Sequence, residues 1–366
     1  MALISSVAPD AAPYLRELLR DADRLVERCA AAPGEARRAL ALTRRAEADL
    51  ASLRLDGSPI DHVPAPDAIA EARATAAVVA EAEPTRSGTW FDAMRSFDGP
   101  DRQDPDAAAH DAAVTALEFD GVARASAADE LGLALLRDPI PALAELHGLL
   151  TRDLVAPSRI GQLRRSEQAV HDASVGRILY FTVEPDRIAT ELASFADRVV
   201  AAGDDHGLIT SGLVHLDLLR IHPFDAANGR LARAAARLVL RARGLDPDGL
   251  AAPELALDED RLGYHDEVAR TLRRREPTVW LERWGEAVTA GLRRAARDLG
   301  VLDVDVPERA EVFVAGRPPG SFTVVDHRDE TGLDDTELRA DRRTLLDAGR
   351  IDRVPGSRGL RFAVAG

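Results

Sequence analysis

A histidine, an asparagine, a glycine and two arginines lie close together in the middle of the chain. They are His222, Asn228, Gly229, Arg230 and Arg233. An imidazole is the usual general base near neutral pH. Two guanidiniums three residues apart share one face of a helical turn, where they can bind phosphate oxygens. A glycine at a helix start lets a phosphate approach the unpaired backbone N–H groups. The pattern predicts a base beside a phosphate-binding helix start.

Two helices are expected to position these residues. The apolar run 207–220 reads as a helix, and Pro223 ends it because proline disfavours a helical conformation in the preceding residue. A second helix is expected over 229–243, with Gly244 as its stop signal. Taken one by one, the same residues also fit a buried histidine at a loop–helix junction and solvent-exposed arginines. Their ordered combination favours the site.

The run from His222 to Arg233 reads His-Pro-Phe-Asp-Ala-Ala-Asn-Gly-Arg-Leu-Ala-Arg. It resembles the signature of the Fic (filamentation induced by cAMP) family, His-Pro-Phe-x-Asp/Glu-Gly-Asn-Gly-Arg-x-x-Arg. Gly161–Arg164 is similar to the start of the family's target-docking hairpin, and 257–268 to the helix that follows the motif. The resemblance covers roughly residues 126–300.

This resemblance implies transfer of AMP from ATP to a Ser, Thr or Tyr hydroxyl of a target protein. His222 would deprotonate the hydroxyl group, and the hairpin 161–183 would align a target segment by strand addition. The nucleotide-binding residues that the resemblance implies are Phe224, Ala227, Asn228, Gly229, Arg230, Arg233 and Tyr264.

Two departures from the family pattern concern the donor and its metal. The acidic position that holds Mg²⁺ in the family is Ala226 here, and the first glycine is Ala227. Asp225 is acidic but lies one residue early, and in a tight loop this shift points its carboxylate elsewhere, so it is a poor candidate for the metal ligand. Mg²⁺ is usually held by one or two carboxylates plus substrate phosphates, so the loss of one weakens the case for ATP chemistry. Two alternatives therefore remain beside AMP transfer. One is a Fic enzyme with another donor, and the other is a degenerate Fic protein that senses a nucleotide or binds DNA as a regulator.

An upstream segment resembles the inhibitory helix of many Fic proteins, Ser/Thr-x-x-x-Glu-Gly/Asn. It contains Ser52, Asp56 and Gly57, with Asp in place of Glu. In the family the acidic residue pairs with the second motif arginine, here Arg233, and blocks productive ATP binding. Since Asp is one methylene shorter than Glu, this pairing would require a closer helix.

The fold expected from these patterns is mainly α. An N-terminal helical region with the inhibitory segment (1–125) precedes a Fic core with a short β-hairpin flap (126–300). The last part, 305–366, reads as a winged helix: a helix–turn–helix over about 323–348, followed by a two-stranded wing. A single helix is expected over 258–274, and Trp280 and Trp284 are expected in the core.

The winged-helix segment has two readings. Its basic side chains could contact DNA, or it could be a packing module; the candidate contacts are Arg339, Arg342, Arg343, Arg358 and Arg361. Acidic residues nearly balance the basic ones there, which favours packing. The net charge of −15 also argues against a general nucleic-acid binder.

Composition suggests a cytoplasmic protein. The 366 residues are 46% hydrophobic, and Cys29 is the one cysteine, which suits a reducing compartment. No signal peptide or membrane-spanning run is evident. The nine histidines form no known metal-ligand spacing. The target protein and the oligomeric state stay open, with a homodimer as one option.

Overall fold

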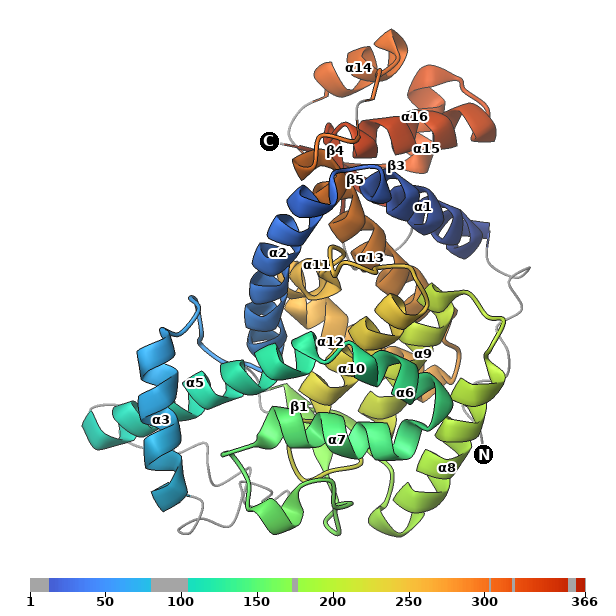
Figure 1. Ribbon diagram of the computed structural model, residues 1–366. Helices are drawn as coiled ribbons and strands as arrows, with labels where there is room; N and C mark the ends of the chain where they lie inside the picture. Colours follow the sequence, from blue (N-terminus) through green and yellow to red (C-terminus); the bar gives the residue numbers. More distant parts are fainter. Residues whose placement is uncertain are drawn as a thin grey trace.

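The computed structural model describes residues 13–79, 105–172, 177–302, 304–317, 320–354 and 360–365. The fold is mainly α, as expected (Figure 1). The helices and strands are α1 (Pro13–Ala30), α2 (Gly34–Leu55), α3 (Pro66–Val79), α5 (Pro105–Ala127), α6 (Glu130–Arg137), α7 (Pro139–Thr151), η2 (Pro157–Arg159), β1 (Ala169–Asp172), β2 (Arg177–Phe181), η3 (Pro185–Arg187), α8 (Ile188–Ala201), α9 (Gly207–Ile221), α10 (Asn228–Ala242), α11 (Pro253–Glu259), α12 (Arg261–Arg274), α13 (Thr278–Asp298), α14 (Glu308–Ala315), β3 (Ser321–Thr323), α15 (Val324–Thr331), α16 (Asp335–Asp347), β4 (Ile351–Arg353) and β5 (Arg361–Val364).

Helices α9 and α10 form the centre of the molecule and pack against each other (Figure 1). Almost every residue of α9 is buried, which agrees with its apolar sequence. Helix α9 ends at Ile221, directly before the predicted break, and α10 begins at Asn228. The loop with the chemical motif therefore leaves and re-enters the core within six residues (222–227), which fixes both of its ends.

The predicted single helix 258–274 is wrong, because the chain breaks at Asp260. This residue has an extended backbone (φ −132°), and its side chain accepts a hydrogen bond from the backbone N–H of Gly263 at 3.1 Å. An aspartate at this position caps the next helix better than it continues the previous one. The result is two helices, α11 and α12, set at an angle beside the central loop.

Two tryptophans of α13 close the core over α9, as predicted. Trp280 and Trp284 are fully buried. Their indole N–H groups donate to the carbonyl of Gly212 at 2.7 Å and to the hydroxyl of Ser211 at 2.9 Å. Buried indoles that find such partners add apolar contact without leaving a polar group unsatisfied.

The N-terminal helices α1 and α2 are packed onto the core. Helix α1 runs along α13, and α2 runs along α11 with its C-terminal end near the start of α10. In α2, Asp49 pairs with Arg237 of α10 at 3.0 Å, and Arg237 pairs in turn with Glu254 of α11 at 2.9 Å. All three side chains are buried. Because breaking a buried ion pair costs several kcal/mol, α2 is held in a defined register on the core.

The C-terminal unit, from α14 to β5, has its own small core and a three-stranded antiparallel sheet in the order β3-β5-β4. It lies above α1 and α13 (Figure 1). Its second helix, α16, begins with a capping box formed by Asp334 and Glu337. The order of helices and strands agrees with the expected one, whereas the assignment as a winged helix stays a prediction. Arg358 lies outside the described residues.

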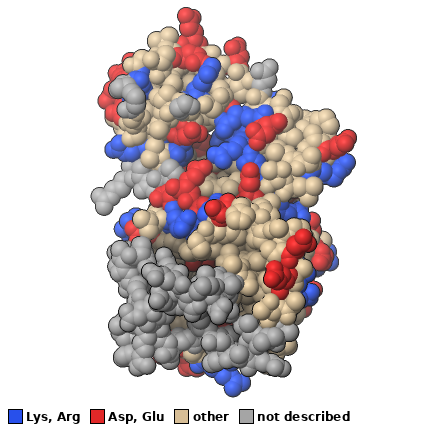
Figure 2. All heavy atoms as spheres, turned by 90° about the vertical axis from the view of Figure 1, so that its left-hand side faces the viewer, with Lys and Arg blue, Asp and Glu red and all other residues tan. Residues whose placement is uncertain are grey.

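Basic and acidic atoms are interspersed over the face drawn in Figure 2. Within the described parts of the chain, no helix is both long and apolar enough to cross a lipid bilayer.

Gly132 provides a test of the packing that positions α10. A Cβ atom there would lie 2.6 Å from the carbonyl oxygen of Leu238 and 3.1 Å from the Cβ of Ala242, both on α10. We expect Gly132→Ala to lower the free energy of unfolding by about 1–2 kcal/mol, since overpacking costs about 1–3 kcal/mol and a helical alanine returns up to about 1. Urea unfolding measures the change. Gly203→Ala is the control, because a Cβ there meets nothing within 4 Å; equal losses in both variants would contradict the packing argument.

Candidate active site

A cavity of about 1180 Å³ opens beside the loop between α9 and α10. The β1–β2 hairpin, α11, α12 and the end of α2 form its other walls. The predicted site residues that line it are His222, Asp225, Ala227, Asn228, Gly229, Arg230, Arg233, Tyr264, Asp56 and Gly57. Phe224 and Ser52 lie buried behind this lining. The structure therefore gathers residues predicted from positions more than 200 apart in the sequence around one space.

His222 is half-buried at the mouth of the loop, in the left-handed backbone conformation (φ 51°, ψ 62°). Its Nδ1 lies 2.9 Å from the carbonyl oxygen of Leu219 and therefore donates a hydrogen to it. Burial lowers the pKa of His222 to about 4, and the nearby charge of Arg164 acts in the same direction. At neutral pH the ring is uncharged, with its proton on Nδ1 and a lone pair on Nε2. This is the state that a general base requires.

Arg164 joins the hairpin to the loop on which His222 lies. Its Nε donates to the carbonyl of His222 at 2.5 Å, and its Nη2 donates to the carbonyls of Ile221 at 3.3 Å and of Val183. Its backbone N–H donates to the carbonyl of Pro223 at 3.0 Å. With only 2% of its surface exposed, this arginine fixes the backbone of the histidine relative to the flap.

Asn228 organises the loop from inside. Its Nδ2 donates to the carbonyl of Phe224 at 2.7 Å, and its Oδ1 accepts from the N–H of Phe224 at 3.0 Å. Phe224 stacks on His147 with ring centroids 4.1 Å apart. Since both polar atoms of the Asn228 amide are used by the loop, the groups left for a phosphate are the backbone N–H groups in the first turn of α10. Ala227 lies directly before that turn with φ 59°, a conformation that favours glycine.

The segment 52–57, which resembles an inhibitory helix, contacts both motif arginines. Arg233 donates to the hydroxyl of Ser52 at 2.8 Å, to the carbonyl of Ser52 at 2.7 Å and to the carboxylate of Asp56 at 2.7 Å. Helix α2 packs closely enough for the shorter aspartate to reach its partner. Arg230 lies 3.6 Å from Asp56 and 3.1 Å from Glu118 of α5.

The carboxylate of Asp56 also occupies the helix start. A Cβ atom on Gly229 would lie 2.6 Å from Oδ1 of Asp56, so only a glycine leaves room for this approach. A carboxylate at a helix N-terminus beside two guanidiniums takes the place that an anionic phosphate would take. In this state the phosphate pocket is filled by a group of the protein itself.

Tyr264 and His265 of α12 form the wall opposite the loop. The Tyr264 hydroxyl lies 3.0 Å from Nε2 of His215 and interacts with Arg233. His265 Nε2 lies 2.9 Å from the carbonyl oxygen of Leu55, at the end of α2. The wall therefore contacts both the second motif arginine and the inhibitory segment.

The residues present do not fit a dedicated Mg²⁺ site at the loop. The carboxylate of Asp225, the doubtful candidate from the sequence, forms an ion pair with Arg159, and its carbonyl accepts from Gln168 at 3.0 Å. Ala226 offers no ligand. Among the described residues, no group of three or more His, Cys, Asp or Glu side chains is arranged to hold a metal ion.

Sequence reasoning missed three residues at this site. Glu118 binds Arg230, His265 binds the end of α2, and Arg164 fixes the loop. Only Arg164 had a signal, its place at the start of the hairpin. Glu118 and His265 are ordinary members of polar helix faces, and nothing in their spacing points to the site.

Residues 139–240 match the Fic/DOC family. This span runs from α7 to α10 and includes the hairpin, the loop of His222 and both motif arginines. Residues 139–240 are therefore a Fic/DOC-family domain.

The fold is similar to a crystal structure of a Fic family protein from Desulfovibrio desulfuricans G20, with 17% identity over 97% of each chain and a TM-score of 0.56. It is also similar to Fic-1 from C. elegans, with 14% identity over 81% of this chain and 76% of that chain and a TM-score of 0.48. At 17% identity, the likeness to the first of these structures shows the fold alone. The sequence has no significant match among curated proteins.

The protonation state of His222 can be measured directly. Because burial lowers its pKa to about 4, ¹⁵N-edited NMR at about pH 6 is expected to show a neutral ring with the proton on Nδ1. In an unfolded chain its pKa is about 6.5, so the stability tied to this group is complete above that pH and is lost as pH falls toward 4. The signal is assigned by its loss in His222→Gln. A His222 signal that titrates near the unfolded value would contradict the assignment.

Proposed function

We propose that this protein is a Fic-type protein adenylyltransferase that transfers AMP from ATP to a hydroxyl group of a target protein, and that it is autoinhibited in the state described. The observation that supports this most is the pairing of a neutral imidazole with a helix start and two guanidiniums around one cavity. A base, an anion-binding site and room for two substrates are what phosphoryl-group transfer requires.

The reaction that fits this geometry is a displacement at the α-phosphorus. Nε2 of His222 accepts the proton of the target hydroxyl, and the hydroxyl oxygen forms a bond to the α-phosphorus. The bond between that phosphorus and the oxygen bridging to the β-phosphorus breaks, and pyrophosphate leaves. The N–H groups at the start of α10 and the guanidiniums of Arg230 and Arg233 would stabilise the negative charge on the phosphates.

The protein groups available to bind the phosphates are guanidiniums and backbone N–H groups. Because the loop offers no carboxylate for Mg²⁺, any metal in the reaction would be held by the nucleotide's phosphates rather than by Ala226 or Asp225.

The target segment is proposed to bind along the hairpin β1–β2, which borders the cavity. A two-stranded hairpin leaves outer edges with unpaired backbone groups, and a peptide can pair with such an edge with little demand on its sequence. Phe181 on β2 is 74% exposed and would give a docked strand an apolar contact.

Autoinhibition follows from competition for one site. The carboxylate of Asp56 and the distal phosphates of ATP both require Arg233 and the space over Gly229. ATP can bind with its phosphates in the reactive position only after Asp56 leaves.

The alternative of a nucleotide-sensing regulator without catalysis is favoured by two observations. Ala226 removes the usual metal ligand, and both motif arginines are neutralised by carboxylates. If the Asp56→Gly variant binds nucleotide but transfers no label, the protein is a regulator and not an enzyme.

Removing the inhibitory carboxylate is expected to activate the protein. Asp56→Gly frees Arg233 and should raise incorporation of label from ATP marked on the α-phosphate by about 10- to 100-fold, since a charged hydrogen bond contributes about 1.5–3 kcal/mol. The measurement is autoradiography of the protein itself after incubation with ATP and Mg²⁺.

Three controls define this experiment. Asp61 lies in the same loop after α2, is exposed and does not contact the motif. The variant Asp61→Gly should therefore leave labelling unchanged. His222→Ala in the Asp56→Gly background should abolish labelling, and ATP marked on the γ-phosphate should give none. Labelling that survives His222→Ala would reject the mechanism.

Restoring a carboxylate at the loop tests the departure from the family motif. In the Asp56→Gly background, Ala226→Asp is expected to raise Mg²⁺-dependent labelling by about 10-fold, because a carboxylate would bind the metal together with the phosphates. Asparagine has nearly the same size as aspartate but carries no charge, so Ala226→Asn should give no increase in labelling. Equal rates in the two variants would show that the site works without a protein ligand for the metal.

A further inference from the structure

A second, smaller cavity lies where the C-terminal unit meets α1 and α13. Its volume is about 80 Å³, and its walls come from α1, α13, α16, β4 and β5. Six arginines line it: Arg293, Arg294, Arg297, Arg342, Arg343 and Arg353. The sequence gave no sign of it, because the six come from two distant segments of the chain.

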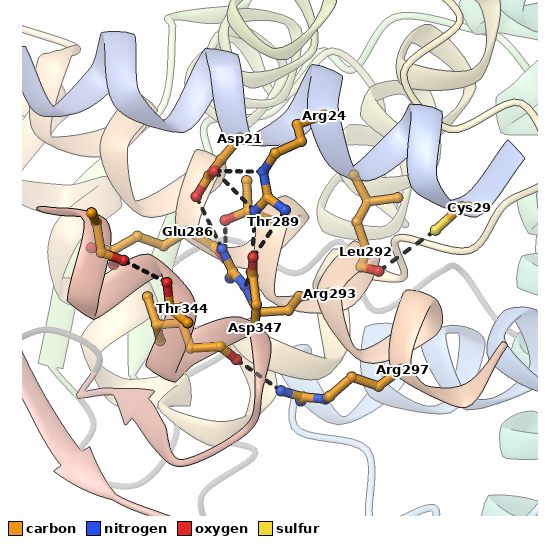
Figure 3. Close-up of polar contacts among 12 residues, drawn as sticks. Asp21, Arg24, Cys29, Glu286, Thr289, Leu292, Arg293, Arg297, Thr344 and Asp347 are labelled. Carbon is orange, nitrogen blue, oxygen red and sulfur yellow. Dashed lines mark hydrogen bonds and ion pairs between the residues drawn. The ribbon is translucent and has the colours of Figure 1, made fainter. Parts of the chain in front are cut away.

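Two of these arginines are neutralised by carboxylates at the floor. Arg293 pairs with Asp21 of α1 at 3.0 Å and with Asp347 at the end of α16 at 2.7 Å. Figure 3 shows these side chains turned toward one another between the three helices. Arg353 pairs with Glu286 at 2.7 Å. The carboxylates at the floor are therefore already paired with Arg293 and Arg353, and they do not neutralise the remaining arginines.

Arg342 differs from its neighbours because it is buried without an anionic partner. Only 5% of its surface is exposed, and its guanidinium lies 5.8 Å from the ring centroid of Phe362. Its guanidinium lines the cavity without a direct ion pair among the described residues, and Glu17 is the carboxylate that acts on it most. Burial lowers the pKa of Arg342, which is the expected response of a desolvated cation, although Glu17 opposes this from a greater distance. A guanidinium that is largely desolvated, reaches open space only at the cavity and has no direct ion pair is well placed to bind an anion there.

The other cations point to the same space. Arg297 donates to the carbonyl of Leu346 at 2.9 Å, and its pKa is lowered by burial and by the charges of Arg293 and Arg294. Arg343 lies exposed at the rim. Arg294 pairs with Glu259 at 3.3 Å outside the floor. The three arginines that remain at the cavity are Arg297, Arg342 and Arg343, with Glu17 and the exposed Asp352 as the remaining acidic lining groups.

We propose that this cavity binds a tetrahedral oxyanion, a phosphate group, with Arg342 as its principal ligand and Arg297 and Arg343 beside it. On the same measure one water molecule needs about 10–15 Å³, so a cavity of about 80 Å³ has room for one such anion. Because the rim is open, the anion is either free inorganic phosphate or the terminal phosphate of a larger molecule that extends into solvent. The ligand would contact α16 and α13 together, and so bind only when the C-terminal unit is docked.

Thermal unfolding of the full chain tests this proposal. Since a ligand that binds only the folded state stabilises it, inorganic phosphate is expected to raise the Tm by a few degrees over chloride at equal ionic strength. Arg342→Met should lose this rise. Its Tm without phosphate should stay close to that of the unaltered protein, because methionine keeps most of the apolar contact of the arginine side chain.

Two further variants guard against a trivial loss. Arg339 lies exposed on α16, one turn before Arg342 and outside the cavity lining, so Arg339→Met should keep most of the response. Arg343→Met changes only an exposed side chain at the rim and should weaken the response without affecting the fold. Ribose 5-phosphate distinguishes the two sources: an equal rise assigns a terminal phosphate, whereas a rise with inorganic phosphate alone assigns the free ion.

The proposal is overturned if phosphate raises the Tm no more than chloride does. It is also overturned if Arg342→Met keeps the rise, or if the rise is lost in Arg230→Met instead. The last result would assign the phosphate to the helix start at the active site.

Discussion

The guanidinium of Arg233 lies almost completely out of water and needs an anionic neighbour in every state of the protein. Burial by itself lowers the pKa of Arg233, but the carboxylate of Asp56 outweighs this and raises it above the ordinary value. The same arginine is positioned to bind phosphate. One buried cation thus connects the turn that carries Asp56 to the start of α10, and an anion that bound at this place would have to replace the carboxylate of Asp56.

The competition depends on how firmly α2 is held. Asp49 and Arg237 anchor the middle of the helix to α10, and Arg54 pairs with Asp258 of α11 at 2.6 Å. Moving the whole helix would break these pairs. Asp56, in contrast, lies past the last helical residue with 34% of its side chain exposed, and Gly57 follows with φ 88°. A change confined to this turn can withdraw the carboxylate while α2 stays in place, and it breaks far fewer contacts.

The sequence was informative where chemistry and local structure coincide. The motif predicted the loop, the start of α10 and the placement of Arg233, since a helix start and its charges are local features. The pairing of Asp56 with that arginine came from a resemblance, and no spacing rule implies it. Glu118 and His265 were out of reach because partners from distant helices leave no periodic trace. The break at Asp260 was missed since helical periodicity continues across it, and only the capping geometry reveals it.

The loop shows how a departure from a motif is accommodated. Ala227 adopts a left-handed conformation that costs an L-residue about 1–2 kcal/mol relative to glycine, yet the loop keeps its shape. The amide of Asn228 bonds both backbone groups of Phe224, and Arg164 holds the carbonyl of His222 from the other side. Together, these hydrogen bonds stabilise the loop by more than the left-handed conformation of Ala227 costs. The backbone that positions the base therefore does not depend on the glycine, and the substitutions in this motif bear on the metal and the phosphates rather than on the geometry of the histidine.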